Sequence, residues 1–331
     1  MNFLGFAFPL ALLVAVQLIT FTWAATNVTK TSGKDYNEQG KHLSEQPVRR
    51  MLQACNLNTF SLGNSKPTFP EQPGVTIPLC QGEYYATLYN NTLGIARYSL
   101  YKITSEQATA AKVGRPRGDP WKSNQTPGIR QGSKALYQNQ PIQGRYDRGH
   151  LVPVNILSYS HKSARDTFIY TNCVPQIAGF NRGQWNKYEW KIKIYARKTC
   201  SQNGGTLYLI TGTSKVKFVW TLDGQDKITR SKEPLQWLHN NADVNGRIAI
   251  PNSMWTVGCC LNFNNEVVGA FGVMGDNSIN KKDLNKFMMS RQTVADVESA
   301  LKSEDPTIKL FPKGKDCYLP QKNVKLNETH R

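Results

Sequence analysis

Residues with clear chemical potential gather between Tyr146 and Glu189. Imidazole is the usual general base near neutral pH, so His150 is the candidate for activating a water molecule. Attack of water on a phosphodiester concentrates negative charge on oxygen atoms, and a divalent cation neutralises that charge. Magnesium prefers oxygen ligands and keeps several waters, so the amide oxygen of Asn181 could be its direct protein ligand, with manganese as a substitute. These residue types predict metal-dependent cleavage of a phosphodiester.

A helix is expected to position the second half of this stretch. Six residues recur there at intervals of three and four, as expected for one broad face of a helix: Asn181, Trp185, Tyr188, Glu189, Ile192 and Tyr195. Glu189 then lies two turns from Asn181, where a carboxylate can orient the shell around a cation. Before the helix, Thr167–Thr171 is rich in β-formers, and Tyr146–Val154 closes a preceding strand or loop. The expected unit is strand, strand or loop, then helix.

The motif Asp147-Arg148-Gly149-His150, followed downstream by Asn181-x-x-x-Trp185 and then Glu189, resembles the DNA/RNA non-specific endonuclease family of ββα-metal nucleases. The resemblance covers about Tyr84 to Pro312. It implies an α+β fold with a central, mostly antiparallel sheet flanked by helices, and hydrolysis of DNA and RNA with little sequence preference that leaves 5′-phosphate ends. The implied roles are general base for His150, magnesium ligand for Asn181, outer-shell carboxylate for Glu189, and support for Arg148 and Asn172.

Substrate phosphate is expected to meet further cations. Family members often carry an arginine four residues after the glutamate, and this chain has Lys193 there, so the contact would be a point charge instead of a bidentate fork. An upstream arginine is also implied, and either Arg115 or Arg117 fits, because Asp119-Pro120 follows both. The spacing does not choose between them.

Simpler interpretations exist for each residue taken alone. The Asp-Arg-Gly-His motif could be a turn in which His150 only packs, and Asn181 could be a helix cap. Trp185 is better explained as a core residue than as a platform for substrate. The order in which these residues occur favours a nuclease site. The alternative function is a basic polyanion-binding protein on a nuclease scaffold whose catalysis has decayed.

The first 25 residues contain no charged side chain and form a nearly continuous apolar run that ends in Ala24-Ala25. Such a run predicts a secretory signal peptide at 1–25, although it is also long enough for a signal anchor. The absence of arginine argues against a mitochondrial transit peptide. Residues 26–54 are polar and basic and predict a flexible leader. We therefore expect a secreted, extracellular protein without stable membrane association after cleavage.

Residues 55–320 have the composition of a folded endonuclease domain, and a polar tail is predicted at 321–331. Residues 105–145 are expected to form a basic loop that leads phosphate toward the site, and Asp223–Pro234 a second charged loop. Helical spacing at Thr293–Leu301 predicts a short helix. Apolar runs bounded by turns predict the strands of a sheet covered on both faces: Tyr84–Tyr89, Ile95–Ile103, Thr206–Val216, Arg247–Pro251, Met254–Leu261 and Glu266–Met274.

Seven cysteines behind a signal peptide imply disulfides. Cys55 and Cys80 can form a local bridge, and the neighbours Cys259 and Cys260 are expected to reach different partners. The odd count leaves at least one thiol free or intermolecular. Four glycosylation acceptor sequences agree with a secretory route; they begin at Asn27, Asn90, Asn124 and Asn327.

The formal net charge of +18 predicts attraction to polyanions. DNA and RNA are the expected partners, but heparin-like glycans would meet the same charge. An extracellular protein with this site is similar to the secreted nucleases of arthropod gut and saliva. The oligomeric state stays open.

Overall fold

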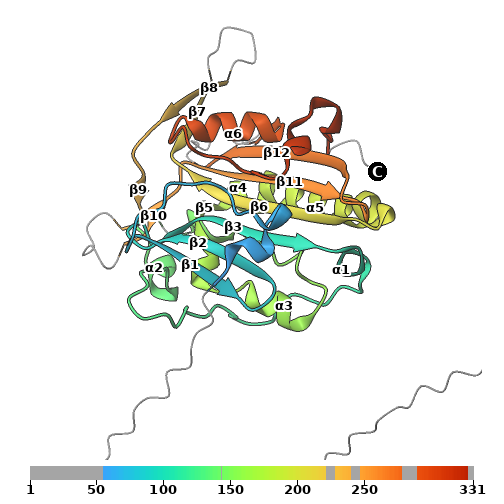
Figure 1. Ribbon diagram of the computed structural model, residues 1–331. Helices are drawn as coiled ribbons and strands as arrows, with labels where there is room; N and C mark the ends of the chain where they lie inside the picture. The colour runs from blue at the N-terminus through green and yellow to red at the C-terminus, as the bar shows by residue number, and fades with distance from the viewer. Residues whose placement is uncertain (1–54, 143, 221–227, 240–246, 278–288, 327–331) are drawn as a thin grey trace, which may run out of the picture. The chain divides into compact units, whose positions relative to one another are not determined.

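The structure is a computed structural model that describes residues 55–142, 144–220, 228–239, 247–277 and 289–326. Seven antiparallel strands form its main sheet, in the order β1-β2-β3-β6-β11-β12-β13 (Figure 1). Their bounds are β1 Thr76–Gln81, β2 Tyr85–Asn90, β3 Ile95–Ile103, β6 Thr206–Ser214, β11 Ser253–Leu261, β12 Val267–Asp276 and β13 Met289–Gln292. The predicted signal peptide and leader lie outside the described residues.

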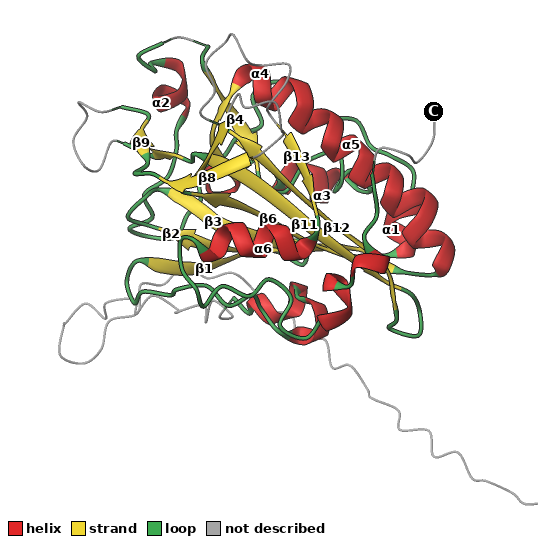
Figure 2. Cartoon of the chain, turned by 90° about the horizontal axis from the view of Figure 1, so that it is seen from above, coloured by secondary structure: helices red, strands yellow, loops and turns green. Residues whose placement is uncertain are grey.

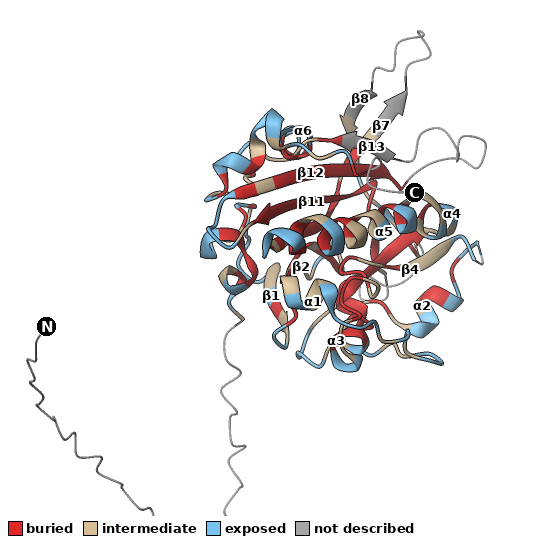
Figure 3. Ribbon diagram, turned by 90° about the vertical axis from the view of Figure 1, so that its right-hand side faces the viewer, coloured by how far each residue is buried: buried red, intermediate tan, exposed pale blue. Residues whose placement is uncertain are grey.

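Both faces of the sheet are covered, which explains why its central strands are almost continuously apolar. Every residue of β11 is buried, and Figure 3 shows β11 and β12 as buried along nearly their whole length. On one face, α6 (Val294–Lys302) contributes Val297 and Leu301 to the same hydrophobic core as Val257 of β11. On the other face, α5 (Asn186–Tyr195) packs Ile192 into the second core (Figure 2).

A separate strand pair and the helix that follows it form the unit predicted to carry the site. Strands β4 (Tyr146–His150) and β5 (Cys173–Ile177) are antiparallel, with His150 opposite Cys173. The chain continues through one helical turn, α4 (Ala178–Phe180), and a π-helical turn at Asn181–Trp185 before it enters α5. Single π turns widen a helix and are frequent at functional sites. This strand–strand–helix order confirms the expected unit.

Shorter elements complete the described fold. The helices are α1 Ser105–Thr109, α2 Lys134–Gln138, α3 His161–Asp166 and a π-helical end to α5 at Ala196–Cys200. Short 3-10 turns span Leu57–Phe60, Leu62–Asn64, Tyr170–Asn172, Ser201–Asn203, Lys315–Tyr318 and Pro320–Lys322. Two further hairpins join β7 Val216–Trp220 with β8 Ile228–Lys232 and β9 Gln236–Trp237 with β10 Ala249–Ile250.

Several expectations about local structure need correction. The β-formers Thr167–Thr171 do not form a strand; the second strand of the site unit starts at Cys173. Asn172 explains the difference, because its amide nitrogen donates to the carbonyl of Thr167 and closes this segment into a turn. The predicted loop Asp223–Pro234 contains β8. The predicted polar tail also begins too early: the backbone N–H of Val324 donates to the carbonyl of Ala270, and Leu326 is buried.

The disulfide expectations are confirmed. Cys55 is bonded to Cys80, and the neighbours Cys259 and Cys260 reach different partners, Cys317 and Cys200. Because β11 alternates its side chains between the two faces of the sheet, these two bridges tie opposite layers to it. The remaining cysteine, Cys173, is a buried thiol whose pKa is raised to about 12, chiefly by burial. In the part of the chain that is described, no helix is long and apolar enough to cross a membrane.

Glu298 on α6 anchors the segment that follows the helix. Its carboxylate is 4 % exposed and accepts hydrogen bonds from the Leu310 backbone N–H at 2.9 Å, the Tyr318 hydroxyl and the Lys302 ammonium. Burial raises the pKa of this carboxyl group, but the hydrogen-bond donors lower it by a larger amount, so the net pKa lies below the ordinary value.

Replacing Glu298 by glutamine is therefore expected to lower the free energy of unfolding by about 1–3 kcal/mol at neutral pH. Since the folded-state pKa is depressed, the contribution is present at neutral pH and is lost as pH falls through that pKa. Urea unfolding at pH 7 and at acidic pH measures both effects, with the exposed Glu83→Gln as control. An equal loss of stability in the two variants would contradict the anchoring role.

Candidate active site

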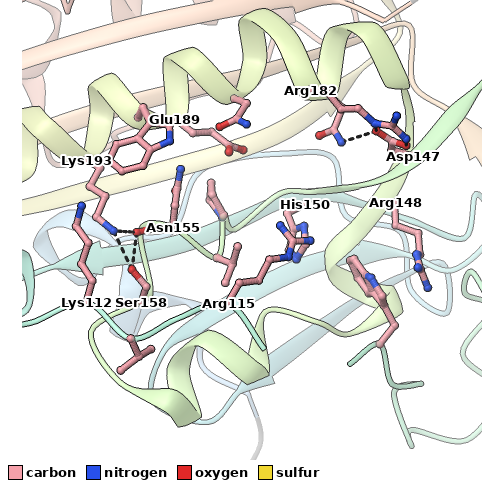
Figure 4. Close-up of a pocket in the computed structure, with 17 residues that line it drawn as sticks. Lys112, Arg115, Asp147, Arg148, His150, Asn155, Ser158, Arg182, Glu189 and Lys193 are labelled. Atoms are coloured by element: carbon pink, nitrogen blue, oxygen red, sulfur yellow. Dashed lines mark hydrogen bonds and ion pairs between the residues drawn. The ribbon is translucent and has the colours of Figure 1, made fainter. Parts of the chain in front are cut away.

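A cleft of about 630 Å³ lies between α5 and the segments around β4 (Figure 4). Most of the residues predicted to carry chemistry line it, namely Arg115, Arg148, His150, Asn181, Glu189 and Lys193. Five cationic side chains and two carboxyl groups face this space. The fold therefore gathers residues that are far apart in the sequence into one basic cleft.

His150 ends β4 and packs its ring between two aromatic side chains. The ring centroids of His150 and Trp121 are 4.7 Å apart, and those of His150 and Phe168 are 4.8 Å apart. Its Nε2 atom is buried and has no hydrogen-bond partner among the described residues. Burial lowers the pKa of His150 to about 3, and the positive charges of Arg115 and Arg148 act in the same direction. The imidazole is therefore uncharged near neutral pH.

Two buried side chains, Asn172 and Gln176, lie against the backbone on either side of His150. Asn172 is fully buried, and its side chain bonds both the N–H and the carbonyl of Val152, two residues after the histidine. It does not line the cleft, so its place is that of a supporting residue behind the cleft wall. Gly149 lies against the buried Gln176: a Cβ at 149 would come within 2.1 Å of Oε1 and 2.5 Å of Cβ of that side chain.

A Gly149→Ala variant is consequently expected to displace the end of β4, because the clash includes Cβ of Gln176, which cannot move away without its backbone. We expect a loss of about 1–3 kcal/mol in the free energy of unfolding and a larger proportional loss of any activity that depends on His150. Thermal unfolding and cleavage rates, measured well below the melting temperature, report the two effects. Gly114→Ala, where an added Cβ meets nothing within 4 Å, is the stability control. Wild-type stability and rate in Gly149→Ala would contradict this account.

Asn181 is held in one orientation by its neighbours. Its Nδ2 donates to Oδ2 of Asp147 at 2.9 Å. Arg182 donates to the same carboxylate from Nε at 2.9 Å and from Nη2 at 2.6 Å. The amide nitrogen is thereby occupied, and the amide oxygen is the atom left for a ligand. The motif residue Asp147 therefore pairs with the helix that follows and not with its neighbour Arg148.

Two arginines lie close to His150. The guanidinium of Arg115 lies 5.0 Å from the centroid of Phe168, and that of Arg148 lies 5.2 Å from the centroid of Trp121. Arg148 also donates to Asp119 at 3.0 Å. Arg117 does not line the cleft, so of the two upstream arginines only Arg115 is placed to meet a ligand there.

Glu189 lies on α5 and lines the same cleft. Burial raises the pKa of its carboxyl group to about 8, and the opposing effects of the Trp185 side chain and of Arg115 are smaller. The group is thus largely protonated at neutral pH in the metal-free protein. A cation nearby would favour the ionised form.

The donor set fits a hard cation that keeps most of its waters. Within the described ranges, no group of three or more His, Cys, Asp or Glu side chains could hold a metal ion by itself. The oriented amide oxygen of Asn181 is nevertheless the ligand type that magnesium accepts. Its companion Glu189 is a carboxyl group that burial keeps protonated near neutral pH and that a bound cation would favour in its ionised form.

Other residues of the cleft were not singled out as site residues from the sequence. They include Lys112, Trp121, Asn155, Ser158, Arg182 and Trp190. Arg182 could have been suspected because it adjoins Asn181, and Lys112 because it belongs to the predicted basic loop. The loop residues Trp121, Asn155 and Ser158 belong to no periodic pattern in the sequence. Trp190 lies on a predicted helix, and no sequence feature distinguishes it from other exposed helical residues.

Comparison with known proteins gives consistent results. A family model described as DNA/RNA non-specific endonuclease matches residues 65–304. The chain is 28% identical over 151 residues to a nuclease of Nostoc sp., covering 46% of this chain and 51% of that protein. It is 29% identical over 161 residues to a mitochondrial nuclease of Saccharomyces cerevisiae, covering 48% and 47%. The chain thus spans about half the length of the curated relatives it matches.

A solved structure shares the fold. A chain from a crystal structure of an EndoG/EndoGI complex superposes with a TM-score of 0.52 at 20% sequence identity, covering 72% of this chain and 87% of that chain. The antiparallel sheet and the strand–strand–helix unit of the present chain are therefore those of an EndoG-like α+β fold.

Proposed function

This chain belongs to the DNA/RNA non-specific endonuclease family, and on that premise we propose that it is a metal-dependent endonuclease that hydrolyses phosphodiester bonds. DNA and RNA are its proposed substrates, and 5′-phosphates its proposed ends. The observation that carries the proposal is one basic cleft that holds His150, Asn181 and Glu189 together. Side chains that meet phosphate and not base edges give little sequence preference.

The proposed division of labour follows the geometry. His150 accepts the proton of the attacking water; because Nε2 is enclosed, the proton is taken on Nδ1. Arg115 and Arg148 bind the phosphate beside it, and Asn172 and Asp147 position His150 and Asn181 respectively. Asn181 and Glu189 would hold a magnesium ion, or manganese in its place, which supplies charge neutralisation for the phosphorane-like transition state when bound.

An extracellular setting is proposed as well. Three disulfides support it, because such bonds persist in oxidising compartments. The uncharged N-terminal run supports export. Relatives that carry the word mitochondrial in their names show that other addresses occur among similar proteins.

Digestion of supercoiled plasmid by the purified mature chain tests the proposal. We expect nicking and degradation that EDTA abolishes and magnesium restores, and loss of cleavage by about a hundredfold or more in Asn181→Ala. The exposed Asn264→Ala should cleave like the wild type. Tight plasmid binding without cleavage in any divalent metal would reject the enzyme and leave a basic polyanion-binding protein.

A further inference from the structure

The enclosed Nε2 atom of His150 has no hydrogen-bond partner among the described residues. A general base is ordinarily kept in one orientation by a hydrogen bond to the ring nitrogen that does not react. Because no described residue makes that bond here, packing must orient the imidazole. The rings that pack against it belong to Trp121 and Phe168.

Trp121 is the ring that joins His150 to the rest of the cleft wall. Its centroid lies 4.7 Å from that of His150, 5.3 Å from that of Phe168 and 5.7 Å from that of Tyr170. The guanidinium of Arg148 lies 5.2 Å from the same ring. Trp121 is half-buried and lines the cleft, whereas Phe168 is fully buried. One side chain in the cleft wall thus contacts both the proposed base and a proposed phosphate-binding arginine.

The backbone next to Trp121 is bonded to the segment that carries Phe168. The N–H of Lys122 donates to the carbonyl of Phe168 at 3.0 Å, and the N–H of Tyr170 donates to the carbonyl of Lys122 at 3.0 Å. The Lys122 ammonium also pairs with Asp166 at 2.7 Å. These bonds hold the two aromatic side chains together as one unit around the imidazole.

We propose that Trp121 is a positioning residue for phosphodiester cleavage, which holds the imidazole of His150 in its reactive orientation in place of a hydrogen-bonded partner. The inference rests on the proposed function, because this orientation matters for cleavage only if His150 is the base. Arg148 has a second support, the ion pair with Asp119 at 3.0 Å, so loss of the indole leaves this cation in the cleft. The effect of Trp121 is therefore expected on the rate of the reaction and not on substrate binding.

Replacing Trp121 by alanine opens a space beside the imidazole into which the ring can turn. A general base must lie within about 2.6–3.2 Å of the atom that gives up its proton, and misplacement by about 1 Å costs on the order of a hundredfold. We therefore expect kcat to fall by about 10-fold to 100-fold in Trp121→Ala, while KM stays within about threefold. Trp121→Phe keeps an aromatic ring and should retain kcat within about fivefold of the wild type. Trp121→Leu, which fills part of the space without an aromatic ring, should lie between the two.

Two measurements test the role. Initial rates on a DNA duplex in magnesium give kcat and KM, and NMR relaxation of the labelled His150 ring in EDTA gives its order parameter. The order parameter should be near the rigid value of about 0.85 in the wild type and in Trp121→Phe, and below about 0.6 in Trp121→Ala. Trp237→Ala is the matched control, because Trp237 is also half-buried and lies 4.6 Å from a guanidinium, that of Arg247, but does not line the cleft. This control should change neither kcat nor the order parameter.

A rigid His150 ring in Trp121→Ala, or a kcat within about threefold of the wild type, would overturn the positioning role. An equal fall of kcat in Trp121→Ala and Trp237→Ala would overturn it too, since general destabilisation would then explain the loss. A wild type that cuts no DNA rejects the proposed enzyme. The order parameters need neither metal nor substrate, so they still decide whether Trp121 orients His150.

Discussion

Replacing His150 by alanine is expected to reduce the rate of phosphodiester cleavage by about a hundredfold to ten-thousandfold, the range that general bases contribute. The ring is enclosed by Trp121 and Phe168, so its loss removes a positioned base and leaves the two arginines in place. Affinity for nucleic acid in EDTA should therefore change little compared with the rate. Initial rates on a fluorescent duplex and binding isotherms in EDTA separate the two quantities.

The low pKa of His150 shapes the expected pH dependence. Burial and the charges of Arg115 and Arg148 favour the neutral ring, so protonation of the free enzyme at this residue occurs only near pH 3. A pKa of about 3 describes a weak base; burial is its largest cause, and a bound phosphate would offset only the smaller contribution of the two arginine charges. The exposed His161→Ala is the matched control. A His150→Ala rate within about threefold of wild type would reject the base role.

A sequence pattern predicts a part of the site well when that part depends only on residues close together in the chain. The helical spacing from Asn181 to Tyr195 depends on neighbours three and four residues apart, and the structure has a helix there. The clustering of β-formers at Thr167–Thr171 is equally local, but the Asn172 side chain bonds the backbone of this segment, and a turn results. Local propensity is overridden wherever a buried side chain claims backbone groups in this way.

Loop residues depend on contacts that no sequence spacing encodes. Arg115 and Arg117 are equivalent by sequence, and only the path of the loop over Phe168 brings Arg115 into the cleft. The same applies to Lys112, whose place over Trp190 joins segments 78 residues apart. The disulfides between Cys200 and Cys260 and between Cys259 and Cys317 likewise follow from strand register, which the cysteine count leaves undetermined.

Glu189 is expected to show a conflict between stability and activity. Its pKa is raised from the ordinary value of 4.5 to about 8, chiefly by burial. Between these two pH values the metal-free folded state therefore binds a proton that the unfolded state has released. Folding stability therefore falls as pH rises through this window, by at most about 1.4 kcal/mol per pH unit for this group. Below about pH 4.5 the contribution of Glu189 to folding stability is fully present, and above about pH 8 stability falls no further on account of this group.

A Glu189→Gln variant should consequently be more stable than wild type in EDTA at pH 8 and yet lose cleavage activity by about a hundredfold. Because the wild-type carboxyl group must ionise to serve a cation, magnesium affinity should rise with pH between 6 and 8 in the wild type and stay flat in the variant. Urea unfolding in EDTA and calorimetric titration of magnesium give the two measurements. Lower stability of the variant at pH 8, or unchanged activity, would show that this buried carboxyl group is structural. Higher stability together with lost activity means that the protein tolerates the cost of burying this group because the reaction needs it.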